Sequence, residues 1–194
     1  MLNPSTIIFG IAFVAVIFSG YADLILGSSW KKFYFMSGVR VFRKQISIES
    51  RYSNIPTPSL FEKRLSSCLM GSFTFKELAP NQYGFRQKLF SFTLNHVTHG
   101  LITFDTEDNQ ITVEGYLNWL VLSITILLLV IFPSLSFINS TSRDEFTNLL
   151  FTCVFGWSLM FGIPILFDLS RLKIITEIAV ELWTRKYAHN HERA

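Results

Sequence analysis

The sequence has little charge, few cysteines and no strong excess of one sign of charge. Only 16% of its 194 residues are Asp, Glu, Lys or Arg, whereas an ordinary soluble domain has about 25%. The two cysteines, Cys68 and Cys153, lie in a polar region and in an apolar run, so no disulfide framework is indicated. The net charge of +3 is too small and too dispersed for a nucleic-acid-binding protein. The composition therefore argues against a disulfide-rich domain and against a nucleic-acid partner.

The chain also lacks the short motifs of common enzyme families. G-x-S-x-G, G-x-x-x-x-G-K, H-E-x-x-H and C-x-x-C are all missing. His96 and His99 suggest a metal site, but residues three apart on a strand face opposite sides, and no Cys or acidic cluster completes a tetrahedral set. The acidic stretch 105–109 lacks the glycine and distal glutamate of a calcium loop. We therefore expect a protein that is not an enzyme and that holds no metal or other cofactor.

Apolar residues, by contrast, are abundant. They make up 49% of the chain, which has 20 Phe. Three runs, 7–27, 119–138 and 146–169, approach the roughly 20 apolar residues that a helix needs to cross about 30 Å of hydrocarbon. The first run has the small residues Gly20 and Ala22 at the spacing of a signal-peptide cleavage site. Because the segment before it has no Lys or Arg, we expect it to be retained as an anchor.

Lys and Arg near the ends of these runs predict the orientation, because basic residues are retained on the cytoplasmic side. Basic residues follow the first run (Lys31, Lys32, Arg40, Arg43, Lys44) and the third run (Arg171, Lys173, Arg185, Lys186). The loop between the second and third runs has only Arg143. We therefore expect a multi-pass protein of the cell inner (plasma) membrane with its N-terminus outside.

The predicted fold class is an α+β membrane protein with three transmembrane helices and a small β-rich domain. Its predicted segments are transmembrane helix 1 (1–28), a cytoplasmic β-rich domain (29–116), transmembrane helix 2 (117–138), an external loop (139–145), transmembrane helix 3 (146–170) and an amphipathic cytoplasmic tail (171–194). We expect Pro133 and Pro164 to kink the second and third transmembrane helices.

Within the middle domain, alternating apolar residues predict strands and one clear hairpin. Ile102 and Phe104 face one way, and Ile111 and Val113 can lie on the same face of the hairpin across a turn at 106–109. One helix is expected at 59–69. The tail has an apolar side that is expected to lie on the bilayer, to pack on a partner or to dock against the chain's own domain.

Two stripes of small residues are expected to be helix-packing faces, because small side chains let a second helix approach closely. The first run has Ala12, Ala15 and Ser19 at three- and four-residue steps, and the third run has Ser158 and Gly162.

Asp23 continues the first stripe near the end of its helix, where the helix dipole disfavours negative charge, so it should need a cation or a hydrogen-bond donor. Asp168 has the matching depth in the third run. We expect a ring of charge at the cytoplasmic boundary that locks the first and third helices together, formed by Asp23, Asp168, Arg171, Lys173, Lys31 and Lys32. A proton or ion relay and a contact with another subunit are the alternative roles, but no ionisable residue lies deeper in the runs.

Three helices are few for a self-contained channel or carrier. Our first functional expectation is therefore a non-catalytic accessory subunit, or an assembly or scaffold factor, of a larger inner-membrane complex. Its partners would be other integral membrane subunits and membrane lipids. The second is a membrane-tethered sensing module whose β-rich domain binds lipid headgroups or a small ligand. The third, an enzyme acting on a membrane-embedded substrate, needs a polar pocket that no motif indicates.

Overall fold

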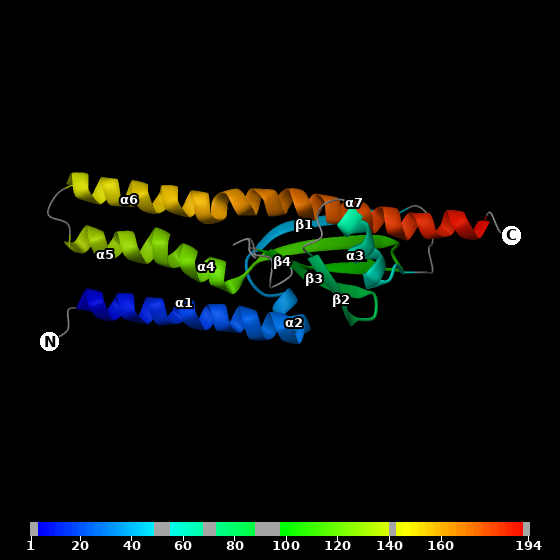
Figure 1. Ribbon diagram of the computed structural model, residues 1–194, viewed down its shortest axis with the longest axis horizontal. Coiled ribbons are helices and arrows are strands. Elements are labelled where there is room, and N and C mark those ends of the chain that lie inside the picture. The colour runs from blue at the N-terminus through cyan, green and yellow to red at the C-terminus, as the bar shows by residue number, and fades with distance from the viewer. Residues whose placement is uncertain (1–3, 49–54, 68–72, 88–97, 140–142, 192–194) are drawn as a thin grey trace.

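The computed structural model describes residues 4–48, 55–67, 73–87, 98–139 and 143–191. It is an α+β structure with one antiparallel sheet and a row of apolar helices that continues into the sheet domain (Figure 1). The predicted α+β class is confirmed in this form.

The row consists of three helical segments that lie side by side (Figure 1). Its elements are α1 (Pro4–Ser29), then α4 (Trp119–Ile126), the π-helical η1 (Leu127–Ile131) and α5 (Phe132–Asn139), and finally α6 (Arg143–Trp157) and the π-helical η2 (Ser158–Gly162), which continues into α7 (Ile163–His191). The α4–α5 segment lies between α1 and α6.

Two of the described helices are long and apolar enough to cross a membrane. They are Ile7–Ser29 and Phe146–Thr184, whereas the apolar helix Trp119–Leu135 is shorter. The first and third predicted runs therefore form long apolar helices, and the second forms a helix of more modest length.

Each π-helical segment ends two residues before a proline. Segment η1 precedes Pro133, and η2 precedes Pro164. Proline has no backbone N–H, and its ring clashes with the carbonyl of the preceding turn, so a wider turn accommodates it. The two prolines at which we expected kinks are thus the positions where the regular α-helical pattern is interrupted.

The sheet contains five described strands. They are β1 (Arg40–Ser47), β2 (Phe73–Ala79), β3 (Gln82–Gln87), β4 (Thr98–Asp105) and β5 (Gln110–Leu117), in the order β1-β5-β4-β3-β2, and all neighbours are antiparallel. The predicted hairpin is confirmed, with Ile102 opposite Val113 and Phe104 opposite Ile111.

Helices α3 (Pro58–Ser67) and α7 cover one face of this sheet. The core between them includes Phe61 and Leu65 of α3, Phe85 and Phe104 of the strands, and Trp183 of α7. The predicted helix at 59–69 corresponds to α3, whose described part ends at Ser67. The short helix α2 (Lys32–Phe35) lies against β3 and β4.

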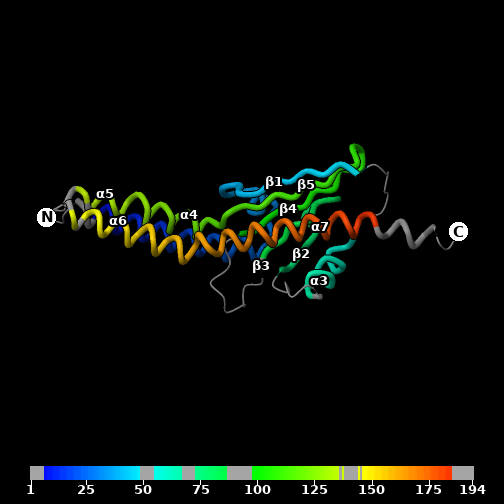
Figure 2. Tube along the Cα trace, turned by 90° about the horizontal axis from the view of Figure 1, so that it is seen from above, coloured from blue at the N-terminus to red at the C-terminus, as the bar shows by residue number. Residues whose placement is uncertain are grey.

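The predicted amphipathic tail is not a separate helix. The boundary at residue 170 falls inside α7, which runs from the helix row along the sheet without a break (Figure 2). No proline or glycine interrupts the sequence from residue 165 onward, so nothing stops the helix there. Its apolar side is buried against the sheet through Leu172, Ile175, Ile178, Ala179 and Trp183. Of the three placements considered for the tail, the structure has the one against the chain's own domain.

Candidate functional site

The six charged residues expected in one ring fall into separate places. Asp168 and Arg171 form an ion pair on α7, with 3.1 Å between the Arg171 Nη1 and the Asp168 Oδ1. The Thr98 hydroxyl donates to the other carboxylate oxygen of Asp168 at 2.8 Å. A buried carboxylate requires such partners, and Asp168 is only 1% exposed. Because Thr98 begins β4, its hydrogen bond to Asp168 fixes α7 to the sheet at the point where this helix leaves the row.

Asp23 has a different environment, at the start of α4. One of its carboxylate oxygens accepts from the backbone amide of Trp119 at 3.2 Å, and the other accepts from the amide of Leu120 at 2.6 Å. The first amides of a helix have no partner within it, and the helix dipole favours a negative charge there. Asp23 of α1 therefore caps the N-terminus of α4.

The three lysines of the expected ring are exposed. Lys31, Lys32 and Lys173 have no ion-pair partner among the residues that the structure describes. Helix α4 lies between α1 and the helix that contains Asp168 (Figure 1). Asp23 is bound to α4 and Asp168 to β4, so the two carboxylates have separate partners.

The small residues of α1 face α4 in part. Ala12 is buried, and the hydroxyls of Ser19 and Ser123 are hydrogen-bonded at 2.6 Å, but Ala15 is exposed. The neighbour of this stripe is therefore α4 rather than the third apolar segment.

The other small patch has contacts within its own helix. The Ser158 hydroxyl donates to the carbonyl of Val154, and the side-chain atoms nearest to an added Cβ at Gly162 belong to Trp157 and Ser158. Within the described ranges, no second helix is recorded against Gly162.

His99 of β4 is buried, with 1% of its surface exposed, and both ring nitrogens have partners. Its Nε2 lies 3.0 Å from the Tyr34 carbonyl oxygen and 3.1 Å from that of Ser37, while its Nδ1 lies 2.6 Å from the Asn118 side chain. The ring also stacks between Tyr34 and Tyr116. His96 lies outside the described residues.

These partners determine the protonation of His99. Carbonyl oxygens only accept, so Nε2 holds the proton that it donates to Tyr34 and Ser37. Burial lowers the pKa of the His99 imidazole, although the hydrogen bonds oppose this effect. In the neutral ring Nδ1 has no proton to donate to the Asn118 Oδ1, which lies 2.6 Å from it. A neutral His99 therefore requires the Asn118 amide to be turned by 180°, so that its NH2 donates to Nδ1.

The remaining contacts connect this histidine to the cap. The Trp119 indole donates to the Ser37 hydroxyl at 3.0 Å, and that hydroxyl donates to the Tyr34 carbonyl at 2.7 Å. The Tyr34 side chain interacts with Asp23. Burial, and to a lesser extent this carboxylate, raises the pKa of the Tyr34 phenol, so the phenol stays protonated. We call this cluster the junction, since it joins α1, α2, β4 and the start of α4; it consists of Asp23, Tyr34, Ser37, His99, Asn118 and Trp119.

Chemically, the junction positions helices rather than presenting a reactive group. Both His99 nitrogens are engaged, and the Asp23 oxygens are bound to amides. Among the described residues there is no group of three His, Cys, Asp or Glu that could hold a metal ion.

Two open grooves lie along the helices. One of about 410 Å³ is lined by apolar residues of α5 and its neighbours, including Pro133 and Phe137. The other, of about 340 Å³, follows Leu159, Ile163 and Phe167 and ends at Asp168 and Arg171.

Sequence reasoning considered His99 and Asp23 but missed Tyr34, Ser37 and Asn118. The available signal was that His99 and Asn118 are polar residues at the open end of the β4–β5 hairpin, where the pairing of the two strands brings them close together. No sequence spacing connected either of them to α2.

No family model matches the chain, and neither the curated proteins nor the solved structures that were compared gave a match.

Proposed function

We propose that this chain is an integral membrane protein with three spans that serves as a non-catalytic accessory subunit or scaffold of a larger inner-membrane complex. The sheet domain lies on the cytoplasmic side and the α5–α6 connection outside. The partners are other integral membrane subunits and membrane lipids.

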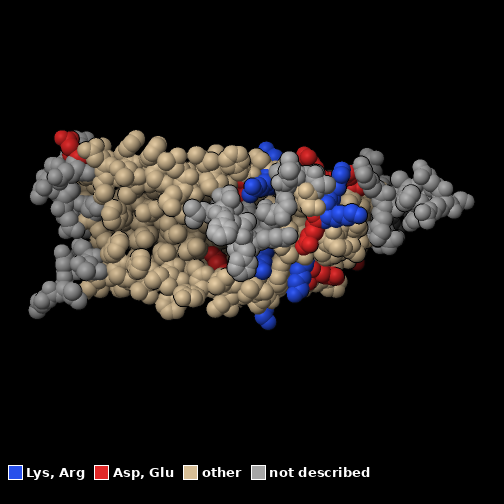
Figure 3. Space-filling model, viewed as in Figure 1, with Lys and Arg blue, Asp and Glu red and all other residues tan. Residues whose placement is uncertain are grey.

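The observation that supports a membrane placement is the division of the surface. Large apolar side chains remain uncovered along the helix row; Phe18, Phe151 and Phe167 are 70%, 69% and 64% exposed. Lys and Arg gather over the sheet half, while the described surface of the helical half shows none of them in this view (Figure 3). Exposed apolar patches of this extent are rare on soluble monomers, and a bilayer covers them.

Two hydrogen bonds between helices support placing the α4–α5 segment in the same layer. Ser19 of α1 pairs with Ser123 of α4, and the Trp157 indole of α6 donates to the Thr125 hydroxyl at 2.8 Å. In hydrocarbon, polar side chains need such partners on neighbouring helices. The α4–α5 segment, from Trp119 to Asn139, lies beside α1 in the row (Figure 1).

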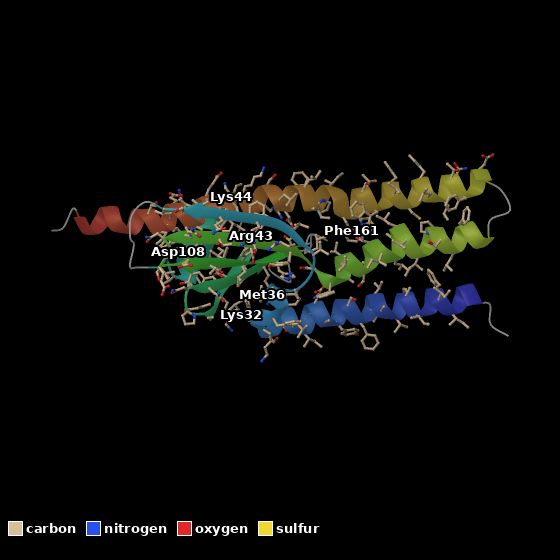
Figure 4. All side chains as sticks on the ribbon, turned by 180° about the vertical axis from the view of Figure 1, so that it is seen from behind. Lys32, Met36, Arg43, Lys44, Asp108 and Phe161 are labelled. Atoms are coloured by element: carbon tan, nitrogen blue, oxygen red, sulfur yellow. The ribbon has the colours of Figure 1, made fainter. Side chains whose placement is uncertain are left out.

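The orientation follows from the same division of charge. Basic side chains of the sheet half, including Lys32, Arg43 and Lys44, lie beyond the apolar helices (Figure 4). The positive-inside rule places that half in the cytoplasm.

A scaffold role is favoured by the shape of the row. The three helical segments lie side by side, and each leaves apolar side chains exposed (Figure 1). Because α7 is one continuous helix, a contact made by η2 or early α7 within the membrane is connected rigidly to the sheet domain.

The test compares two matched pairs of exposed phenylalanines. Phe151 and Phe155 stack on α6 with 5.9 Å between ring centroids, and Phe13 and Phe18 are exposed on α1. Native mass measurement after mild detergent extraction should give a complex of fixed stoichiometry. One double Phe→Ala pair should abolish that stoichiometry while the other retains it. A wild-type chain that is always a single species would contradict the proposal.

The second groove favours one alternative, a sensing module. It joins apolar side chains to the Arg171 guanidinium, which is paired with Asp168 but has further N–H groups that could bind an acidic headgroup at the end of an acyl chain. A single species that retains a lipid, and loses it in Arg171→Gln, would support this alternative.

A further inference from the structure

Three exposed apolar side chains follow one another within seven residues just after α1. Phe33 is 74% exposed, more than any other large apolar side chain in the described part of the chain, and Met36 and Val39 follow at 51% and 46%. Among the described residues of the sheet domain, Leu60 at 37% is the other large apolar side chain left exposed. Figure 4 shows Met36 and Lys32 beside the end of α1.

The backbone holds this segment in place. Trp30 has a φ of 51°, and this left-handed residue ends α1 and turns the chain into α2. The Trp30 ring stacks on Phe35 at 5.1 Å and lies 4.8 Å from the Arg86 guanidinium. Since Tyr34 and Phe35 are buried, the opposite side of α2 presents Phe33 outward.

Basic side chains accompany the apolar ones. Lys31 and Lys32 immediately precede Phe33, both are exposed, and neither has an ion-pair partner among the described residues. Arg40, which follows Val39, is half exposed and pairs with Glu114 at 3.1 Å. The surface therefore combines an apolar tip with uncompensated positive charge.

The length of α1 places this surface at a definite depth. Its 26 residues span about 39 Å at 1.5 Å per residue. The hydrocarbon core is about 30 Å thick, and the bilayer with its headgroups about 40–45 Å. If α1 spans the membrane, as the proposed function requires, its last turn reaches the headgroup layer and α2 follows there.

We propose that the segment 30–40 is a binding site for anionic phospholipid headgroups. Phe33 and Met36 insert among the headgroups, and the ammonium groups of Lys31 and Lys32 bind phosphate oxygens. The inference rests on the membrane placement of α1 proposed above. Each near-surface cation strengthens such binding about fivefold, and an aromatic side chain is favoured in the same layer. An apolar tip preceded by two lysines at this depth fits a lipid surface, whose charge is negative and whose outer layer accepts apolar groups.

The experiment measures depth by spin labelling. In a chain with Cys68→Ser and Cys153→Ala, a nitroxide is attached singly at Phe33→Cys, Met36→Cys, Phe18→Cys or Asp108→Cys, and the protein is reconstituted in phosphatidylcholine vesicles with phosphatidylglycerol. Phe33, Met36 and Phe18 are exposed apolar side chains, and Asp108 lies in the turn between β4 and β5, where its side chain is exposed. Collisions with oxygen and with a water-soluble nickel chelate report the depth.

We expect Phe18 to be deep, Phe33 and Met36 to lie in the headgroup layer and Asp108 to be in water. Lys31→Gln with Lys32→Gln, or vesicles of phosphatidylcholine alone, should shift position 33 toward water several-fold in the collision ratio. A position 33 in water with Phe18 still deep would overturn this inference and leave the proposed function intact. A position 33 shielded from both reagents would also overturn it, because protein would then cover the patch. A position 18 in water would overturn the membrane placement itself.

Discussion

The Asp23 carboxylate of α1 accepts a hydrogen bond of 2.6 Å from the backbone amide of Leu120, the second residue of α4. The two residues are 97 positions apart, so a chain segment that precedes the whole sheet domain caps the helix that follows it. The beginning and the end of the domain are thereby joined at one point.

The first prediction concerns this cap. Asp23→Ala should lower the free energy of unfolding by about 1 kcal/mol, as expected for loss of a capping oxygen, while Asp23→Asn retains an acceptor and should be milder. Asp23→Lys should be worst, because it places a cation at the positive end of the α4 dipole. Thermal unfolding in detergent gives the order, and a wild-type-like Lys variant would show that Asp23 does not cap α4.

The second prediction concerns the β4–β5 hairpin. Phe104 is 2% exposed and packs edge to face on Trp183 at 5.4 Å, so Phe104→Asp should cost about 4 kcal/mol through a buried, unpaired charge. Thr103 is half-buried on the other face, and Thr103→Asp should cost under about 1 kcal/mol. Limited proteolysis measures both, and equal sensitivity would mean that the two faces are not distinguished.

The hairpin and the cap differ in how readable they are from sequence. Alternation along 101–115 is a local signal, because each side chain's face follows from its position. The partner of Asp23 depends on tertiary packing. The sequence indicated that the carboxylate needs a cation or a hydrogen-bond donor, but not that the donors would be the free backbone amides of α4.

The tail and His99 illustrate the same limit. The amphipathic side of 171–194 was evident, but whether it meets lipid, a partner or the sheet depends on where α7 points after leaving the row. Strand geometry argued against His99 as a metal ligand, whereas its contact with the carbonyls of Tyr34 and Ser37 depends on the turn at Trp30, which no local pattern indicated.

The third prediction is a pH dependence from His99. Burial lowers the pKa of its imidazole below the ordinary 6.5, so below about pH 6.5 the unfolded chain binds a proton that the folded state does not. The free energy of unfolding should then fall by about 1.4 kcal/mol per pH unit down to the folded pKa, and the contribution is fully present above about pH 6.5. His99→Gln should remove this component, so chemical denaturation from about pH 5 to 8 should give a smaller slope; equal slopes would contradict the assignment.

The fourth prediction compares two glycines. A Cβ at Gly100 of β4 would lie 2.2 Å from the Glu114 carbonyl oxygen and 2.3 Å from the Phe85 ring, so Gly100→Ala should destabilise by about 3 kcal/mol. Gly156 of α6 has open space, and Gly156→Ala should be neutral or stabilise by up to about 1 kcal/mol. Thermal unfolding of both variants checks this, and a Gly100→Ala protein as stable as the wild type would contradict the close approach of β3, β4 and β5.

The proposed placement of the sheet domain in the cytoplasm is tested most directly by thiol labelling in intact cells. In the chain with Cys68→Ser and Cys153→Ala, single cysteines replace Asp108, in the turn after β4, and Asp144, at the start of α6; both native side chains are exposed. A membrane-impermeant maleimide should label Asp144→Cys in intact cells and Asp108→Cys only after permeabilisation. Labelling of Asp108→Cys but not of Asp144→Cys in intact cells would reverse the orientation, and equal labelling of both would contradict the membrane crossing between them.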